Sequence, residues 1–318
     1  MTEQKQQQAK QKVIFDHDGG VDDLLSLMLL LTMEHIELLA VTITPADCYL
    51  SDATLSTLKI LNKMDRTDVL VAKGSIHGVN PFPADWRAQP KICNALPDMI
   101  LQPVNLNQIS ELPADQVIAS LLEQHQQVDI LMTGPCSNLT ACLAKHPELK
   151  SHIQQVIWMG GAVDVPGNVA MHNHDKSAEW NAFWDPMATQ ALIESGLVVK
   201  MISLDATNCL PVDMTFLAQL AQQRAYPLSH LAGQFWATTI NSIPSYEYTY
   251  FMWDVLATSV LGVAADAIEF SAIELAVSIT EPNAGQTYRA KGSGNEILVA
   301  TGANKQLVLD YVLRQFKG

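Results

Sequence analysis

VIFDHDGGVDDLLSLMLLL, residues 13–31, is the stretch that decides the fold of this chain. It opens with the apolar run VIF, passes through four aspartates and two glycines, and closes in a segment rich in Leu and Met. A short apolar run is typical of a buried strand, and a longer apolar segment after Asp residues is typical of a helix. We therefore expect a strand, a tight turn at Gly19 and Gly20, and a helix.

The alternation of short apolar runs with longer segments continues along the chain. Strands are expected near 36–44, 68–72, 128–133, 155–159, 197–204, 268–279 and 296–300, and helices near 51–63 (with Ser51 as N-cap), 115–126, from Ser137, 187–195, 213–223, 228–241, 254–264 and 304–316. The Pro-rich residues 74–114 and the stretch ending at Pro186 are expected to be irregular. This pattern predicts an α/β fold with an open, mostly parallel central sheet flanked by helices. We expect a single domain over residues 13–318, after a flexible tail of residues 1–12.

Charge and composition exclude several classes of function. The 318 residues include 19 Lys and Arg against 33 Asp and Glu, which gives a net charge of −14. An acidic chain lacks the basic surface by which nucleic-acid binders and proteins of anionic membranes hold their partners. Five scattered cysteines predict reduced thiols, and the polar N-terminus lacks the apolar core of a secretory signal. With no apolar run of about 20 residues, the sequence predicts a soluble, cytoplasmic protein that binds neither membrane nor nucleic acid.

The four aspartates after the first strand are the strongest chemical signal in the sequence. Asp16, Asp18, Asp22 and Asp23 lie where a strand ends and a helix begins, which is where ligands bind in sheets of this type. Helix capping explains one or two of them, Asp22 and Asp23 in particular. Four carboxylates so close together repel one another unless a cation neutralises them. The all-oxygen ligand set predicts a hard ion, Ca²⁺ or Mg²⁺.

Two other kinds of protein remain open at this point. D-x-D-G also occurs in haloacid-dehalogenase-type phosphatases, and that interpretation makes Asp16 the nucleophile of a Mg²⁺-dependent phosphohydrolase. It needs a downstream Lys, for which Lys145, Lys150 and Lys200 are available, although none lies in a convincing motif. The chain also contains no G-x-x-x-x-G-K phosphate loop. A non-catalytic protein that binds nucleosides or sugars is the third hypothesis.

DHDGGVDD (16–23) fits the pattern D-x-D-x-x-x-D-D and resembles the signature of the nucleoside hydrolases, which split the N-glycosidic bond of ribonucleosides. Further blocks resemble this family in its order, from residue 13 to about 260: TPADCY (44–49), NPFPADWR (80–87), TGPCSNL (133–139), MGGAVDVPGNV (159–169), AEWNAFWDP (178–186), SLDATN (203–208) and WDVLA (253–257). The resemblance is closest to the purine-preferring inosine–adenosine–guanosine branch. Trp253 stands where the inosine–uridine branch carries a His, and Trp86 is the second marker of this branch.

The resemblance implies a Rossmann-like nucleoside hydrolase fold, a Ca²⁺ cofactor, a homodimer and a role in purine salvage. Asp18, Asp23 and Asp254 would bind Ca²⁺ through their carboxylates, and Thr133 would bind it through its backbone carbonyl oxygen. Such an oxygen set suits a hard ion and leaves positions for water and for the ribose hydroxyls. Asp16 would have a supporting or helix-capping role.

The resemblance also assigns residues to the substrate. Asp22 would bind the 2′- and 3′-hydroxyls of the ribose, while Asn181, Asn168 and Glu179 would hold the sugar, the last two on its 5′ side. Asp18 would be the general base that accepts a proton from the attacking water. Trp86 and Trp253 would stack on the two faces of the leaving purine, and Asp47 would assist its protonation. These roles imply hydrolysis of purine ribonucleosides to free base and ribose, without a ranking of inosine, adenosine and guanosine; a broader base specificity is the alternative.

Other conspicuous residues have plainer interpretations. Trp158, Trp180, Trp184 and Trp236 are expected to pack in the core. His172 and His174 in HNHD are two residues apart and lack a third ligand in register, so we expect no metal there. Residues 242–252 are rich in Tyr and could close over the base as a lid. This segment and residues 170–177 depart from the family pattern, as does Gly20, where relatives can carry a polar residue.

Overall fold

The computed structural model describes residues 9–240 and 249–318. Most of the expected tail and most of the expected lid, residues 1–8 and 241–248, therefore lie outside the described residues. The first strand begins at Gln11, two residues before the expected boundary at 13. Among the described residues, no helix combines the length and the hydropathy needed to cross a lipid bilayer.

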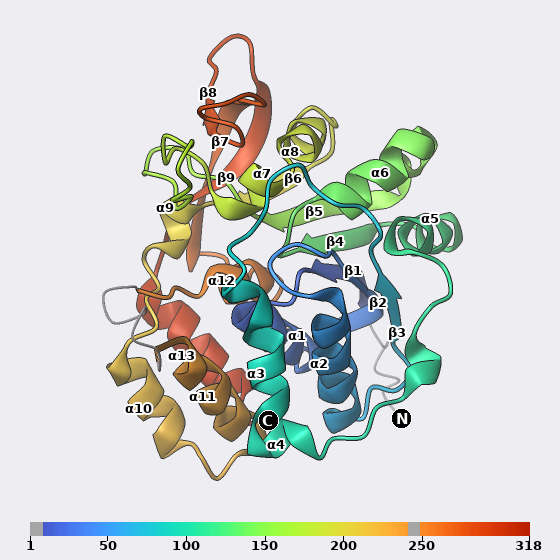
Figure 1. The fold of residues 1–318 in the computed structure, drawn as a ribbon, viewed down its shortest axis with the longest axis vertical. Coiled ribbons are helices and arrows are strands. Elements are labelled where there is room, and N and C mark those ends of the chain that lie inside the picture. Colours follow the sequence, from blue (N-terminus) through green and yellow to red (C-terminus); the bar gives the residue numbers. More distant parts are fainter. Residues whose placement is uncertain (1–8, 241–248) are drawn as a thin grey trace, which may run out of the picture.

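A single nine-stranded sheet runs through the structure in the order β3-β2-β1-β4-β5-β6-β9-β7-β8 (Figure 1). Pairing is parallel from β3 to β9, whereas β7 pairs antiparallel with both β9 and β8. The expected open, mostly parallel sheet is therefore confirmed. The strands are β1 (Gln11–His17), β2 (Ile36–Ile43), β3 (Leu70–Lys73), β4 (Val128–Met132), β5 (Ile153–Met159), β6 (Val199–Ile202), β7 (Ile268–Val277), β8 (Thr287–Arg289) and β9 (Asn295–Ala303).

Helices cover both faces of this sheet. The α-helices are α1 (Val21–Leu31), α2 (Leu50–Lys63), α3 (Gln89–Ala95), α4 (Pro97–Ile100), α5 (Ala114–Gln124), α6 (Ser137–Lys145), α7 (Trp180–Trp184), α8 (Pro186–Ile193), α9 (Leu204–Thr207), α10 (Met214–Gln222), α11 (Pro227–Ile240), α12 (Trp253–Ser259) and α13 (Lys305–Gln315). Short 3-10 turns are η1 (Trp86–Ala88), η2 (Leu106–Gln108) and η3 (Pro147–His152). Helices α1, α2, α11, α12 and α13 form one layer, and α5, α6 and α8 form the other (Figure 1).

The buried strand β1 supplies both cores, because successive side chains of a strand point to opposite faces. Val13 and Phe15 belong to the larger core, together with the apolar residues of α1. Ile14 belongs to the second core, with residues of α5 and α6. All three side chains are fully buried, which explains why this strand is a continuous apolar run rather than an alternating one.

Several local expectations were wrong. Residues 74–114 contain η1, α3, α4 and η2, so this segment is partly helical rather than irregular. Two of its prolines, Pro90 and Pro97, occupy the first turns of α3 and α4, where their missing N–H costs nothing. The N-cap of α2 is Tyr49, and Ser51 lies within the helix. Helix α7 interrupts the second irregular stretch because Glu179 caps it with its own carboxylate.

Candidate active site

The predicted site residues come together in one pocket of about 500 Å³. It lies at the carboxyl ends of β1 and β4, where the strand order of the sheet reverses, and such reversals leave a crevice for ligands. All eleven residues that the sequence assigned to catalysis, substrate or metal line it: Asp18, Asp22, Asp23, Asp47, Trp86, Thr133, Asn168, Glu179, Asn181, Trp253 and Asp254.

The turn after β1 brings three aspartates to the pocket floor. Gly19 has a φ of 92°, and a Cβ at this position would lie 2.5 Å from the Cβ of Ala53, so the turn requires glycine. The backbone N–H of Gly20 donates to Asp23 Oδ2 at 2.7 Å, which caps the start of α1. A side chain at Gly20 would meet Asp47 Oδ2 at 2.9 Å, so glycine here leaves room for Asp47 beside the other carboxylates.

Carboxylate oxygens converge from two distant segments of the chain. Asp22, Asp23 and Asp254 each present an oxygen, and these atoms lie within 4.8 Å of one another. Thr133 Oγ1 donates to Asp23 Oδ1, and the backbone N–H of Asp47 donates to Asp18 Oδ2 at 3.1 Å. The first turn of α1 thus supplies Asp22 and Asp23, the residue after β4 supplies Thr133, and α12 supplies Asp254.

Burial and mutual repulsion perturb the acidity of this cluster strongly. Burial, followed by the charges of Asp23 and Asp47, raises the pKa of Asp18 well above its ordinary range. Burial and the charge of Asp22 raise the pKa of Asp23 to about 7. The pKa of Asp254 is raised well above its usual value by burial and then by Asp22 and Asp23. Such a cluster favours a bound cation, because a nearby positive charge reverses each of these shifts.

The donor atoms fit a hard divalent cation. All of the candidate ligands offer oxygen, and Asp47 Oδ1 is buried without a hydrogen-bond partner among the described residues. The Thr133 carbonyl oxygen accepts from Asn181 Nδ2 at 2.8 Å, which leaves its second lone pair for an ion. Carboxylate and carbonyl oxygens of this kind are the ligands that Ca²⁺ prefers.

Polar side chains on the opposite wall are oriented by backbone contacts. Glu179 accepts from the N–H groups of Gly161 at 3.0 Å, Asn181 at 2.9 Å and Ala182 at 3.2 Å, and burial raises its pKa to about 7. Asn181 donates from Nδ2 to two carbonyl oxygens, so Oδ1 is the atom that it can offer to a ligand. Asn168 Oδ1 accepts from the backbone N–H of Trp180 at 3.1 Å, so its Nδ2 remains a donor. This wall therefore offers donors and acceptors suited to hydroxyl groups.

Aromatic side chains form the rest of the pocket. Trp86 meets Trp180 edge to face with 5.0 Å between ring centroids, and Trp180 stacks on Phe82 at 5.3 Å. Trp253 meets Tyr250 edge to face at 4.7 Å. The expectation that Trp180 only fills the core needs correction, because Trp180 is buried and also lines the pocket. Flat aromatic walls of this kind suit a planar ring system.

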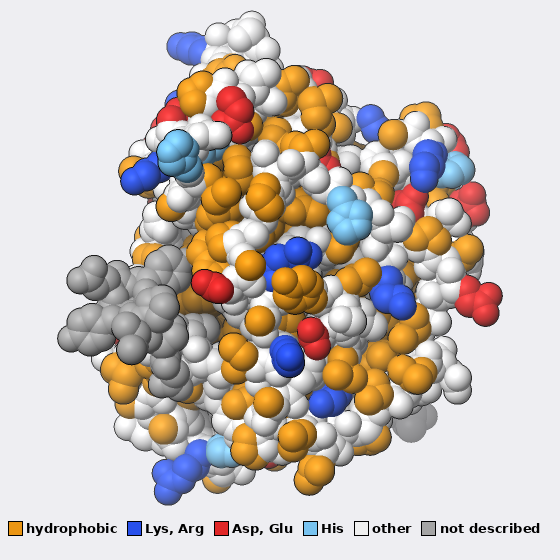
Figure 2. Space-filling model, in the orientation of Figure 1, with side chains coloured by type: hydrophobic (Ala, Val, Ile, Leu, Met, Phe, Trp, Pro, Cys, Tyr) orange, Lys and Arg blue, Asp and Glu red, His pale blue; other side chains and the backbone are white. Residues whose placement is uncertain are grey.

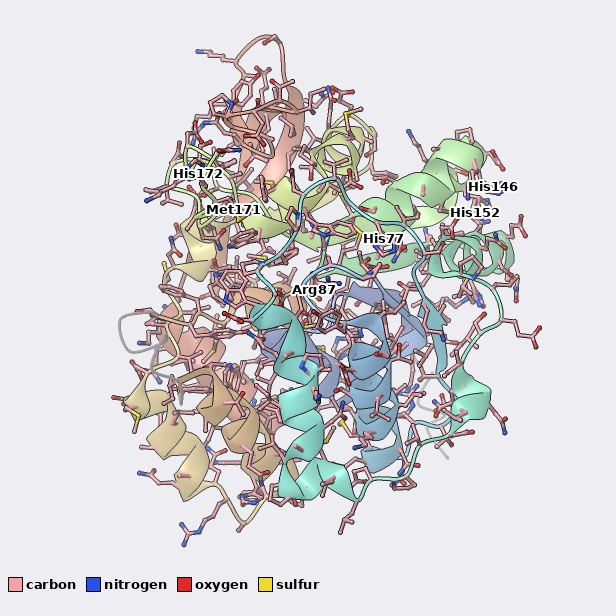
Figure 3. All side chains as sticks on the ribbon, in the orientation of Figure 1. His77, Arg87, His146, His152, Met171 and His172 are labelled. Atoms are coloured by element: carbon pink, nitrogen blue, oxygen red, sulfur yellow. The ribbon has the colours of Figure 1, made fainter. Side chains whose placement is uncertain are left out.

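Arg87 lies in η1, just before α3, where Figure 3 labels it. Its guanidinium lies over the ring of Tyr49, with 4.5 Å to the centroid, and its carbonyl oxygen accepts from the Tyr49 N–H at 3.1 Å. Burial and then Asp23 and Asp22 raise the pKa of Asp47 well above its usual value, and Arg87 opposes this shift. Arg87 therefore fastens the Trp86 segment to the loop that carries Asp47.

Asp16 does not line the pocket and does not cap α1. It is fully buried, and it accepts hydrogen bonds from Thr42 Oγ1 at 2.6 Å, Thr44 Oγ1 at 2.9 Å and Asn138 Nδ2 at 2.9 Å. These bonds join the ends of β1 and β2 to α6, which is a supporting role. No lysine is among the described residues that line the pocket. The geometry thus argues against Asp16 as the nucleophile of a phosphohydrolase.

Sequence reasoning gave some of the lining residues no individual role, although Tyr250 lies in the segment 242–252 that was expected to close over the base. Tyr250 donates from its hydroxyl to Asp22 Oδ1 at 2.5 Å, and Gln89 accepts from the Val21 N–H at 3.2 Å. Tyr250 and Gln89 are close in sequence to Trp253 and Trp86, which the sequence did single out. Nothing in the local pattern indicates that Tyr250 contacts Asp22 or that Gln89 contacts Val21. The other lining residues that had no predicted role in the pocket are Val21, Phe82, Asp85, Ile92, Met159, Trp180, Thr238 and Thr239.

The histidines of HNHD have a different environment. His174 contacts the Ala284 carbonyl oxygen at 2.9 Å through Nε2 and accepts from the Lys176 N–H through Nδ1, so both ring nitrogens already have protein partners. His172 is exposed on the loop after β5, next to Met171, which packs against the aromatic cluster around Trp180 (Figure 3). On the face drawn in Figure 2, acidic side chains are scattered singly among apolar and neutral ones. The dense group of carboxylates is the buried one in the pocket.

Comparison with curated proteins reveals relatives over part of the chain. The pyrimidine-specific ribonucleoside hydrolase RihA of Shewanella oneidensis is 34% identical over 204 residues, which are 62% of this chain and 59% of that protein. RihA of Klebsiella pneumoniae is 27% identical over 242 residues, 71% of each chain. The matches thus span about 59 to 71% of the length of these two relatives.

Comparison with solved structures covers nearly the whole chain. The inosine-uridine preferring nucleoside hydrolase of Bacillus anthracis superposes with a TM-score of 0.90 and 34% identity, over 96% of this chain and 99% of that one. A purine-preferring ribonucleoside hydrolase of Gardnerella vaginalis shares the fold, with a TM-score of 0.81 and 23% identity, over 97% of this chain and 98% of that one. The family model described as inosine-uridine preferring nucleoside hydrolase matches residues 13–310. The chain therefore belongs to the inosine-uridine preferring nucleoside hydrolase family.

Proposed function

We propose that this protein hydrolyses the N-glycosidic bond of purine ribonucleosides with the help of Ca²⁺, releasing free base and ribose. The observation that carries the proposal is one pocket in which buried carboxylates form the floor and Trp86 and Trp253 contribute to the walls. A ribose with its hydroxyls suits the first part, and a flat base suits the second. A pocket with this many carboxylates repels phosphate groups, which favours nucleosides over nucleotides.

Asp18, Asp23, Asp254 and the Thr133 carbonyl would hold the cation, which, when bound, supplies positive charge that favours deprotonation of water. Asp18 accepts the proton from the attacking water as the general base. Asp22 binds the ribose diol, while Asn168, Glu179 and Asn181 hold the remaining sugar hydroxyls. Together these groups fix the anomeric carbon for attack through an oxocarbenium-like transition state.

Preference for purines rests on the aromatic walls. A bicyclic base offers a larger face than a pyrimidine for stacking on Trp86 and Trp253, and stacking contributes about 1–3 kcal/mol per base. Asp47, which is half-buried beside the acidic cluster, assists protonation of the departing base. Hydrolysis of pyrimidine nucleosides is the second candidate, because RihA from Shewanella oneidensis is described as pyrimidine-specific.

A substrate panel tests the proposal directly. Purified protein is incubated with inosine or uridine at a series of Ca²⁺ concentrations and with a chelator, and released ribose is measured as reducing sugar. We expect ribose from inosine in excess over uridine, loss of activity with chelator, and loss in Asp18→Asn. Asp164→Asn, at an exposed aspartate outside the pocket, serves as the matched control. Absence of ribose from inosine at every Ca²⁺ concentration would refute the proposal, and faster release from uridine would refute the purine preference.

The homodimer, the cytoplasmic location and the part in purine salvage remain predictions from the resemblance. Sedimentation analysis of the purified protein measures the first of these, with a mass of about twice 34.9 kDa expected. A monomer at micromolar concentration would contradict it.

A further inference from the structure

Gln89 is held in one orientation at the edge of the pocket. Its Oε1 accepts from the backbone N–H of Val21 at 3.2 Å, and this N–H belongs to the first turn of α1, where no carbonyl of the helix can pair with it. A flipped amide would place two donors against each other, so Nε2 must point away from Val21. Nε2 has no hydrogen-bond partner among the described residues and is not sealed from solvent, while Gln89 lines the pocket.

We place Gln89 near the base because it is the first residue of α3, three positions after Trp86, which is proposed to stack on the base. Its partner Val21 precedes Asp22, the residue assigned to the ribose. Helices α3 and α11 lie side by side (Figure 1), and α11 contributes Thr238 and Thr239 to the same pocket.

The hydroxyls of α11 complement this donor. Thr238 Oγ1 donates to the Phe235 carbonyl at 2.7 Å and Thr239 Oγ1 donates to the Trp236 carbonyl at 2.8 Å. Their protons are thereby used, so toward the pocket both oxygens can only accept. This end of the pocket therefore combines one fixed amide donor with hydroxyl acceptors.

That combination matches one class of purine. A 6-oxopurine carries an acceptor oxygen at position 6 next to a donor N1–H, whereas adenine carries a donor amino group next to an acceptor N1. We propose that Gln89 Nε2 donates to the 6-oxygen of the bound base, which makes Gln89 a specificity-determining residue that selects inosine and guanosine over adenosine. This inference rests on the proposed function, because it requires a purine nucleoside in the pocket.

The test replaces the donor while it keeps the bond to Val21. Gln89→Glu retains an oxygen for the Val21 N–H but turns the donor into an acceptor, and Gln89→Met removes both at similar length. Gln222→Glu, on the exposed end of α10, controls for the added charge. We measure kcat/KM for inosine and adenosine, competitive inhibition by free hypoxanthine and adenine, and thermal unfolding to verify folding.

The wild type is expected to prefer inosine. Because one hydrogen bond contributes about 0.5–1.5 kcal/mol, Gln89→Met should lower kcat/KM for inosine by about two- to twelvefold and leave adenosine nearly unchanged. Gln89→Glu should lower the inosine-to-adenosine ratio further, and Gln222→Glu should leave it unchanged. Equal losses for both substrates, or a wild type that prefers adenosine, would overturn the role of Gln89 while purine hydrolysis stands. Turnover of uridine without turnover of either purine nucleoside would overturn the proposed function and this inference with it.

Discussion

Tyr250 is expected to contribute strongly to turnover although it belongs to none of the sequence blocks that resemble the family. Its hydroxyl donates to Asp22 Oδ1 at 2.5 Å, and its ring packs edge to face on Trp253 with 4.7 Å between centroids. Burial and the charge of Asp22 raise the pKa of Tyr250 well above its ordinary value, so it remains a donor throughout any practical pH range. Tyr250→Phe removes this one hydrogen bond and keeps the ring contact.

The size of the effect follows from the charge and burial of the pair. Tyr250 is 7% exposed and Asp22 is 4% exposed, so water replaces the lost donor poorly. A hydrogen bond to a charged group contributes about 1.5–3 kcal/mol, which corresponds to a loss of about 10- to 150-fold in kcat/KM. The same change raises the pKa of Asp22 further, because the Tyr250 hydroxyl is a contact that lowers it.

The assay compares inosine with 2′-deoxyinosine and 3′-deoxyinosine. If Asp22 binds the 2′- and 3′-hydroxyls of the ribose, Tyr250→Phe should cause the full loss of kcat/KM with inosine. The loss should be smaller with a deoxyinosine that lacks the hydroxyl bound by Asp22. Tyr311→Phe is the matched control, because the Tyr311 hydroxyl is buried without a partner among the described residues and lies outside the pocket. An equal loss for all three substrates, or a loss below about twofold with inosine, would refute the reasoning.

Three further predictions concern other parts of the molecule. Burial lowers the pKa of His17 to about 3, so below pH 6.5 the unfolded chain takes up a proton that the folded chain does not. The wild type should therefore lose about 1.4 kcal/mol of unfolding free energy per pH unit that His17→Phe does not lose. Urea unfolding at several pH values measures this, and parallel pH dependences of the two proteins would contradict it. Because burial and repulsion raise the pKa of Asp23 to about 7, Ca²⁺ should displace protons below that pH and bind more tightly as pH rises. Calorimetry in two buffers of different ionisation enthalpy measures the proton release. An identical apparent binding enthalpy in both buffers would exclude such a release. Trp86→Ala should reduce kcat/KM for inosine by about 10- to 100-fold and for uridine by less, since stacking scales with the face of the base; equal losses in the steady-state assay would argue against a base contact.

The sequence predicts the floor of the pocket well because its determinants are local. Four aspartates and two glycines, from the end of β1 into the first turn of α1, lie within eight consecutive residues, and a parallel sheet brings the end of β4 beside them. The order of apolar runs likewise predicts eight of the nine strands, but it misses the short edge strand β8. It does not predict α3, because the prolines that mark a loop in a sequence also start short helices once the surroundings accommodate their missing N–H.

The contacts that the sequence could not predict join distant segments. Tyr250 and Asp22 are 228 positions apart, and Gln89 and Val21 are 68 apart, so no local pattern records either pair. A Tyr or a Gln in an irregular segment has no periodicity that reports which way its hydroxyl or amide points. Orientation of a polar group depends on its partner, and the partner is known only when the chain is folded.

This difference between floor and walls has a consequence for specificity. The carboxylates lie just after β1 and in the first turns of α1 and α12, and their positions are fixed by the sheet and by two packed cores. Trp86 and Gln89 lie on η1 and α3, outside the sheet, and contacts through Arg87 and Val21 are among those that connect them to the pocket floor. A substitution in that segment can therefore change which base is accepted while the carboxylate floor stays intact. Membership of the family thus follows from the floor, whereas the choice of base has to be measured on the walls.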